Sequence, residues 1–268
     1  MLRKPIPSTN ELLPVIGLGT WKAFDVPNPE PLRPIIEELS QVNGALIDSS
    51  PMYGRSEQIV GDLIALHRDR FFVATKVWTS GKQTGIQEME ASMRKMRAKP
   101  IDLMQVHNLL DVDVHLATLR EWKAAGLVRY VGITHYTASA HAEVAKVIER
   151  HAVDFLQINY SASERDAERR LLPMAMERGI AVIANRPLAT GDLPARLSRR
   201  PLPSLGGELE AKTWAELLLK FVVSHPAIVC AIPATSNLSH LRDNLRAGAG
   251  PMPDEAQRNR IVQAVSSA

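Results

Sequence analysis

In the segment 45-ALIDSSPMYGRSEQIVGDLI-64, a buried strand, a loop and a helix are predicted to follow one another, an order typical of α/β folds. The apolar run Ala45–Ile47, which stops at Asp48, is typical of a strand end, and the Ser, Pro and Gly residues after it favour turns. Ser56 is then predicted to be the N-cap of an apolar-periodic helix. Asp48 and Tyr53 therefore lie where a strand opens into a loop, which is where parallel α/β folds place their chemistry.

Apolar runs of strand length alternate with segments of helical period along the rest of the chain. Strands are predicted over residues 17–21, 45–48, 71–76, 103–107, 131–134, 155–159, 181–184 and 229–232. Helices are predicted over residues 87–97, 116–125, 138–149, 166–178, 214–223 and 255–265. Parallel strands joined by right-handed crossovers in this number close into a (β/α)8 TIM barrel, an α/β fold whose usual size is about 250 residues.

The N-terminal segment 5–15 places Pro-Ser-Thr-Asn between two short apolar pieces, which predicts a β-hairpin capping the barrel floor. No linker, internal repeat or low-complexity tract divides the chain. The sequence therefore predicts one domain over residues 1–268.

The composition argues against nucleic-acid and membrane partners. The chain has 32 basic and 29 acidic side chains, and its densest basic cluster, 196–200, lacks interleaved aromatic residues. The longest apolar region, 217–232, is interrupted by Lys220, His225 and Pro226, and the N-terminus lacks a secretory signal. A single cysteine, Cys230, fits a packed core thiol in a reducing compartment. We expect a cytoplasmic protein with no membrane segment, and no stretch of the sequence indicates an oligomer.

Several common sites are absent from the sequence. Gly17-Leu18-Gly19 does not continue into a dinucleotide-binding G-x-G-x-x-G motif, since Lys22 stands where the last glycine belongs. His107, Asp111, Asp113 and His115 cluster, but the last three have the spacing of a loop and helix start, with an Asp near the N-cap. No metal site is predicted.

Four polar residues at consecutive strand ends form a coherent chemical set: Asp48, Tyr53, Lys76 and His107. Each alone has a structural explanation, but Lys76 ends a buried run, and a buried cation needs a partner, which Asp48 can supply. A close ammonium is expected to lower the pKa of Tyr53 by about one to three units. With His107 orienting a carbonyl, Tyr53 would act as general acid while hydride arrives at carbon.

The chain resembles the aldo-keto reductases along nearly its whole length. The resemblance rests on the motifs GLGTW at 17–21, IDSSPMYG at 47–54, ATKVW at 74–78, MQVHN at 104–108, GLVRYVGIT at 126–134, LQINYS at 156–161 and IPATSNLSHLRDN at 232–244. It implies a (β/α)8 barrel, a nicotinamide cofactor bound without a Rossmann fold, and a catalytic tetrad of Asp48, Tyr53, Lys76 and His107.

The resemblance also implies a cofactor site, and the chain departs from the family's pattern within it. Thr134-His135 stands where a Ser-Asn pair usually binds the nicotinamide amide, and Asn185-Arg186 replaces the usual Tyr under the ring and the Ser before Pro-Leu. Arg186 is open to three roles: covering the ring, reaching the pyrophosphate, or pairing with a nearby acid. The implied cofactor residues are Gly19, Thr20, Trp21, Asp48, Thr134, His135, Gln157, Arg186, Pro187, Leu188, Thr235, Ser236, His240 and Asn244.

The adenosine end decides the cofactor. The family's frequent Lys and Arg are replaced here by Ala234 and His240, so fixed cations for a 2′-phosphate are lost. Thr235 and Ser236 can still hydrogen-bond a phosphate, and Asn244 can hold the adenine. The sequence predicts NADPH by a modest margin and leaves NADH open.

A small-molecule carbonyl is the predicted substrate. Trp21, Met52, Trp78 and His107 are expected to wall an open apolar pocket, because the family's long carboxyl-terminal loop looks absent. Two alternatives to an NADPH-dependent reductase stay open: a cofactor-binding redox-sensing or regulatory barrel with little turnover, and a metal-dependent hydrolase or isomerase barrel.

Overall fold

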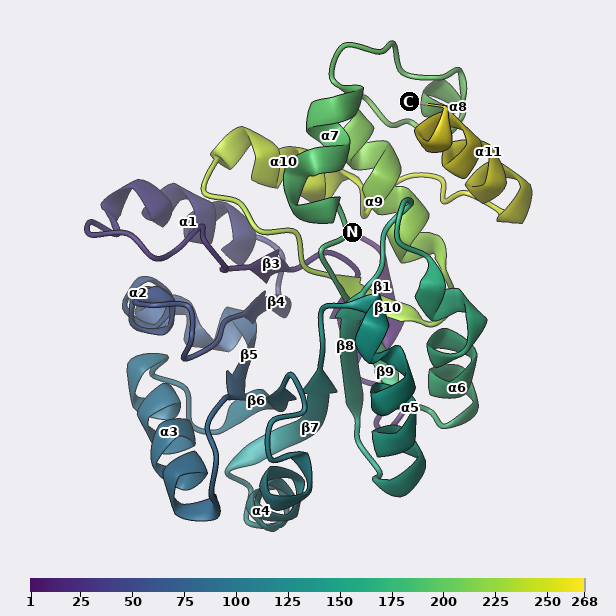
Figure 1. Cartoon of the computed structure of the whole chain (residues 1–268). Coiled ribbons are helices and arrows are strands. Elements are labelled where there is room, and N and C mark those ends of the chain that lie inside the picture. Colours follow the sequence, from purple (N-terminus) through teal and green to yellow (C-terminus); the bar gives the residue numbers. More distant parts are fainter. Residues whose placement is uncertain (268) are drawn as a thin grey trace.

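Eight parallel strands form one sheet in the computed structural model, which describes residues 1–267. They are β3 (Leu18–Gly19), β4 (Ala45–Asp48), β5 (Phe71–Val77), β6 (Ile101–His107), β7 (Val128–Thr134), β8 (Phe155–Asn159), β9 (Ala181–Asn185) and β10 (Ile228–Ala231). Parallel bridges from Ile16 to Ala231 and from Gly19 to Ala234 join the two edges of the sheet. The predicted (β/α)8 barrel is confirmed, with the strands at the centre and the helices around them (Figure 1).

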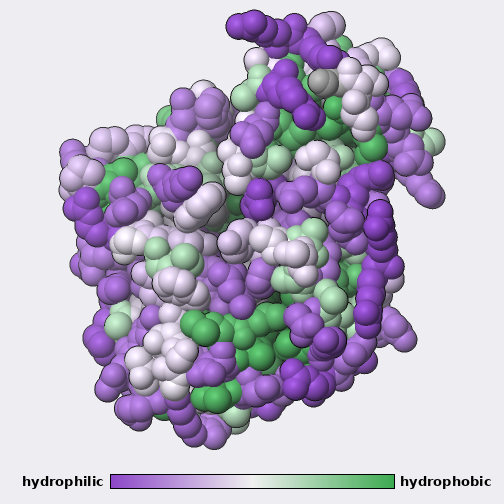
Figure 2. Space-filling model, in the orientation of Figure 1, coloured by the Kyte–Doolittle hydropathy of each residue, from purple (hydrophilic) through white to green (hydrophobic). Residues whose placement is uncertain are grey.

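The helices surround the sheet and pack their apolar faces against it. Their bounds are α1 (Arg33–Ser40), α2 (Ser56–Ile64), α3 (Lys82–Lys95), α4 (Val112–Ala124), α5 (His141–Arg150), α6 (Leu171–Glu177), α7 (Asp192–Leu197), α8 (Leu205–Glu208), α9 (Trp214–Ser224), α10 (Leu238–Arg246) and α11 (Glu255–Ser266). Hydrophilic side chains cover much of the outer helices, while apolar ones gather toward the lower middle of the face in Figure 2. The predicted helix over 166–178 is divided, since a 3₁₀ turn, Asp166–Arg169, precedes α6.

A two-stranded hairpin closes one end of the barrel, as predicted. Strand β1 (Arg3–Pro5) pairs antiparallel with β2 (Leu12–Pro14). Ile6 and Leu13, both nearly free of solvent, pack with inward-facing strand residues such as Phe72. The barrel interior at this end is therefore filled with apolar side chains, which leaves the opposite end for polar groups.

The start of α2 differs from the prediction. Ser56 is the first helical residue and Arg55 is the N-cap, and the buried Ser56 hydroxyl has no hydrogen-bond partner among the described residues. The loop is instead held from outside, because the Asp25 carboxylate accepts the Arg55 backbone N–H at 3.1 Å. Asp111 does occupy the N-cap position of α4, but its carboxylate accepts the Gly81 backbone N–H.

Within residues 1–267, every helix is too short or too polar to cross a membrane.

Candidate active site

The carboxyl ends of three neighbouring strands and one loop bring the tetrad together. Asp48 ends β4, Lys76 is the penultimate residue of β5, and His107 ends β6. Tyr53 lies in the loop after β4, where its backbone N–H donates to the carbonyl oxygen of Ser50. Parallel register places all three strand ends at one rim, so the predicted proximity of these four side chains follows from the barrel.

Lys76 and Asp48 form a buried ion pair. The Lys76 ammonium donates to Asp48 Oδ2 at 2.6 Å and to the Ser49 carbonyl at 2.7 Å, and its side chain is 0% exposed. Burial alone would lower the pKa of Lys76, but the charge and hydrogen bond of Asp48 outweigh burial and raise that pKa above its ordinary value. Lys76 therefore stays charged.

The second oxygen of Asp48 is held by two amides. Asp48 Oδ1 accepts from Gln105 Nε2 at 3.2 Å and from Gln157 Nε2 at 2.9 Å. The backbone carbonyl of Asp48 also accepts from the Thr20 hydroxyl at 3.0 Å. A carboxylate with this many donors is fixed in position, so it anchors Lys76.

Tyr53 lies beside the Lys76 ammonium, but its pKa is not lowered as predicted. The Lys76 nitrogen is 5.1 Å from the centroid of the Tyr53 ring. Burial raises the pKa of Tyr53 above its ordinary value, and the charge of Lys76 only partly opposes it. The correction has a simple cause: the same strand-end packing that brings the cation close also removes water from the phenol. Tyr53 therefore keeps its proton at neutral pH, the form that a proton donor needs.

His107 is an uncharged donor or acceptor. It is 5% exposed, and its Nδ1 lies 3.1 Å from the Ser50 hydroxyl oxygen. The ring meets Tyr53 edge-on, with centroids 6.0 Å apart, and lies 6.4 Å from the ring of Trp78. Burial, with smaller contributions from the charges of Lys76 and His135, lowers the pKa of His107 to about 3. The imidazole is therefore neutral at physiological pH.

This neutrality predicts an acid-dependent loss of stability. The pKa of His107 is about 3 in the folded protein against 6.5 for an ordinary histidine, so only the unfolded chain binds a proton there between these values. Above about pH 6.5, His107 binds no proton in either state, so it does not reduce stability. As the pH falls toward 3, proton binding to the unfolded chain lowers the free energy of unfolding. Denaturant unfolding from about pH 7 to about pH 4 should show a shallower pH dependence in His107→Gln than in wild type. Parallel curves would contradict the assignment. His225, a partly buried histidine whose pKa is also lowered, to about 4, is present in both proteins and so does not affect the comparison.

A cavity of about 1790 Å³ opens over this rim. Asp48, Tyr53 and His107 line it, while Lys76 lies behind them, out of contact with the cavity. Three predicted substrate residues, Trp21, Met52 and Trp78, also line it and are 43%, 40% and 41% exposed, so the apolar rim is open to solvent.

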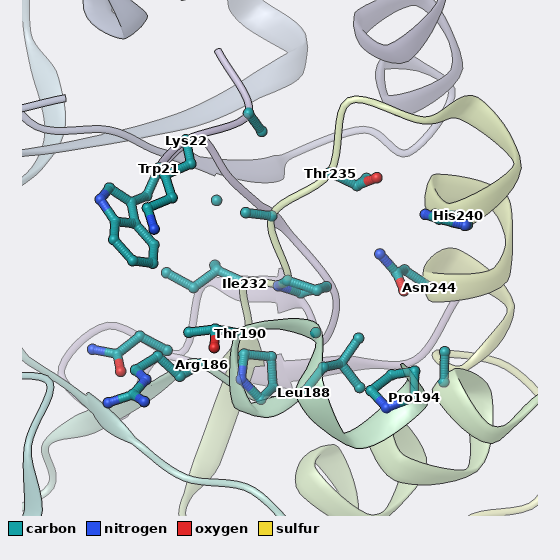
Figure 3. A pocket seen from close by; sticks show the side chains of 18 of the residues that line it. Trp21, Lys22, Arg186, Leu188, Thr190, Pro194, Ile232, Thr235, His240 and Asn244 are labelled. Carbon is teal, nitrogen blue, oxygen red and sulfur yellow. The ribbon is translucent and has the colours of Figure 1, made fainter. Parts of the chain in front are cut away.

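The cavity is elongated, which suits an extended ligand. In Figure 3, Trp21 and Arg186 lie toward one end, and Thr235, His240 and Asn244 lie together at the other. Most of the predicted cofactor residues line this cavity: Gly19, Thr20, Trp21, Asp48, Thr134, Gln157, Arg186, Pro187, Leu188, Thr235, Ser236, His240 and Asn244.

His135 is the predicted cofactor residue that lies outside this lining. Its Nδ1 accepts the backbone N–H groups of Tyr136 at 3.0 Å and Thr137 at 3.3 Å, so this nitrogen serves the loop after β7. Thr134 does face the cavity, and its hydroxyl donates to Gln157 Oε1 at 3.1 Å. The structure thus brings Thr134 and Gln157 together and separates His135 from them.

Asn185 and Arg186 support the loop after β7. Asn185 Nδ2 donates to the His135 carbonyl at 3.2 Å, and an Arg186 guanidinium nitrogen donates to the Tyr136 carbonyl at 3.1 Å. No acid pairs with Arg186 among the described residues. The buried Asn185 Oδ1 has no hydrogen-bond partner among the described residues. The side chains of Asn185 and Arg186 both line the cavity.

Sequence reasoning missed several parts of the site. Ser50, in the loop after β4, contacts His107, and Gln105, on β6, contacts Asp48. Both contacts join residues far apart in the sequence, and the inward position of Gln105 follows only from strand register. The sequence also contained no clear indication that segment 190–215, which includes α7, forms a wall of the cavity. Thr190, Pro194 and Lys212 are among the residues of this segment that line it. The signal for this wall was weak, because a Pro-, Gly- and Arg-rich stretch is also typical of a surface loop.

The side chains considered as metal ligands in the sequence, such as His115 and Asp113, form hydrogen bonds to different partners. His115 Nε2 contacts the Thr79 carbonyl at 2.6 Å, and Asp113 accepts from His151 at 2.5 Å. Across residues 1–267, no three His, Cys, Asp or Glu side chains gather closely enough to hold a metal ion.

Comparisons with known proteins show the family of the chain. The family model described as Aldo/keto reductase family matches residues 15–265, so the chain belongs to the aldo/keto reductase family and is an oxidoreductase. It is 26% identical over 240 residues to methylglyoxal reductase YeaE of Escherichia coli (strain K12), covering 87% of this chain and 84% of that protein. It is also 27% identical over 259 residues to an NADH-specific methylglyoxal reductase of the same organism, covering 83% and 78%.

A solved structure shares the fold. The aldo-keto reductase from Klebsiella pneumoniae in complex with NADPH superposes with a TM-score of 0.82 at 24% identity, covering 99% of this chain and 96% of that one.

Proposed function

We propose that this protein reduces the carbonyl group of small aldehydes or ketones to an alcohol with NADPH, and that Tyr53 is the general acid. The observation that carries the proposal is the buried Asp48–Lys76 pair beside the Tyr53 phenol, at the bottom of an open cavity. Two relatives named as methylglyoxal reductases support the reaction class.

The residues around the cavity fit a nicotinamide dinucleotide. Near the tetrad, Thr134, Gln157 and the unpartnered Asn185 Oδ1 offer the donors and acceptors that a carboxamide needs. At the far end, Thr235 precedes α10 and Asn244 lies within it, and both line the cavity. The backbone N–H groups of Ser239 and His240 are accepted by the Asn237 side chain, so the polar contacts there come from side chains. Pro187, Leu188, Ser236 and His240 complete the residues that would hold the cofactor. When bound, it supplies hydride to the carbonyl carbon.

The protein's own part in the reaction is to handle one proton. Tyr53 gives its hydroxyl proton to the carbonyl oxygen, and the charge of Lys76 stabilises the phenolate that is left. Asp48 keeps Lys76 charged and in place. His107 cannot be the acid while it is neutral, so it orients the carbonyl by a hydrogen bond. Proton delivery of this kind is worth about 10² to 10⁴ in rate.

Turnover separates this function from the regulatory-barrel alternative. Consumption of NADPH should match alcohol formation across a panel of small aldehydes, ketones and sugars, with methylglyoxal included because of the named relatives. A protein that binds NADPH tightly but turns over none of them would be a sensor and not a reductase. Activity that disappears with a chelator and returns with a metal would favour a metal-dependent barrel.

The cofactor preference is expected to be modest. A 2′-phosphate lacks the family's fixed cations here, and His240 lines that end of the cavity in place of the family's frequent Arg. His240→Arg should enlarge the NADPH preference in kcat/KM, because a guanidinium binds a phosphate through two charge-assisted hydrogen bonds. An NADH preference of the wild type would overturn the assignment.

A further inference from the structure

The contacts of Ser50 bear on which nitrogen of His107 carries the hydrogen. His107 Nδ1 lies 3.1 Å from Ser50 Oγ, and Ser50 is fully buried. A neutral imidazole is a donor at one nitrogen and an acceptor at the other. The distance alone permits either direction for this hydrogen bond.

A second contact removes that ambiguity. Ser50 Oγ also accepts the backbone N–H of Met52, at 3.4 Å. If Ser50 donates its hydrogen to His107 Nδ1, both contacts are satisfied and no hydrogen is left over. If Nδ1 donates instead, Ser50 Oγ accepts twice, and its own hydrogen has no acceptor among the described residues. An unsatisfied buried donor costs about 1 to 3 kcal/mol, so the first arrangement is favoured.

We propose that Ser50 is a positioning residue that holds His107 in the tautomer with hydrogen on Nε2, so that this nitrogen donates to the substrate's carbonyl oxygen. The proposal rests on the proposed function for the identity of the acceptor. Nδ1 faces Ser50, and His107 lines the cavity. Nε2 has no hydrogen-bond partner within residues 1–267, so it is free for a ligand. The other tautomer would present a lone pair to the carbonyl oxygen and repel it.

This tautomer gives His107 and Tyr53 different roles as hydrogen-bond donor and proton donor. The Nε2–H of a neutral imidazole is a far weaker acid than a phenol, so it directs the carbonyl without giving up its hydrogen. Tyr53, whose ring lies edge-on to His107, is left as the group that transfers a proton. Ser50 thus acts through His107 and does not touch the reacting atoms.

The tautomer can be read directly by two-bond ¹H–¹⁵N spectra of protein labelled with ¹⁵N-histidine. We expect a protonated Nε2 and a bare, hydrogen-bonded Nδ1 at His107, with His107→Gln identifying the signals. Ser50→Ala should shift them toward a mixture of tautomers, and Ser50→Thr should restore the wild-type pattern. Ser49→Ala, at a neighbouring buried serine whose hydroxyl contacts Thr20, should leave the His107 nitrogens unchanged. A protonated Nδ1 in the wild type, or an unchanged tautomer in Ser50→Ala, would overturn the proposal.

A double-mutant cycle separates positioning from a general structural role. Loss of one hydrogen bond is expected to lower kcat/KM about 3- to 10-fold in Ser50→Ala. In a His107→Gln background, the same change should have no further effect, because the group that Ser50 positions is gone. An equal fall in both backgrounds would mean that Ser50 acts through packing, and would overturn the proposal. The spectra need no turnover, so they decide the tautomer even if the protein reduces no carbonyl.

Discussion

Tyr53→Phe should lower the rate of carbonyl reduction by at least about 10²- to 10⁴-fold, the range typical of losing a general acid. The ring and its edge contact with His107 remain, and the Asp48–Lys76 pair does not depend on the hydroxyl. The affinity for NADPH should therefore stay near that of the wild type. Binding and chemistry would then separate in a single variant.

Two measurements check this result: NADPH titration by fluorescence and the rate of NADPH consumption with a reducible aldehyde. Tyr130→Phe is the matched control, because it removes a hydroxyl that contacts Thr9 and Glu11 at the barrel floor, far from the cavity. It should reduce the rate little. If Tyr53→Phe kept more than about a tenth of the wild-type rate, Tyr53 would not be the general acid.

Lys76→Met should lower both activity and stability. Methionine keeps the length of the side chain but removes its charge, so Asp48, only 2% exposed, loses its ionic partner. Removing one member of a buried pair costs about 3 to 5 kcal/mol of unfolding free energy. The rate should fall as well, since no cation remains to stabilise a Tyr53 phenolate.

Denaturant unfolding of Lys76→Met beside the double variant Asp48→Asn/Lys76→Met separates the two effects. Asparagine removes the unpaired charge and still offers an oxygen to Gln105 and Gln157, the donors to Asp48. The double variant should recover much of the lost stability and none of the activity. An unfolding midpoint unchanged in Lys76→Met would mean that the pair contributes nothing to the fold, against the geometry described here.

The sequence predicted the framework because local patterns encode it. Apolar runs ended by Asp48, Lys76 and His107 marked the strand ends, and parallel strands place their carboxyl ends on one rim. The hairpin at the floor was predicted for the same reason, since turn formers stood between short apolar pieces. These features depend on neighbours in the chain and not on contacts across the barrel.

What the sequence missed depends on contacts between distant residues. The direction of the Tyr53 pKa shift depends on how much water the folded site excludes, which no motif reports. His135 sits beside Thr134 in the chain, yet its Nδ1 is taken up by the next backbone N–H groups. Arg186 contacts the Tyr136 carbonyl, a partner 50 residues away, and none of the three roles considered for it included supporting a loop.

The proton-donor role of Tyr53 is tested most directly by a single turnover. Wild type and Tyr53→Phe, each loaded with one equivalent of NADPH, are mixed with an aldehyde, and the decay of the bound NADPH signal is followed. We expect wild type to convert its bound NADPH with formation of one alcohol per site, and Tyr53→Phe to do so at least about 10²-fold more slowly. Equal decay rates in the two proteins would mean that Tyr53 is not the proton donor.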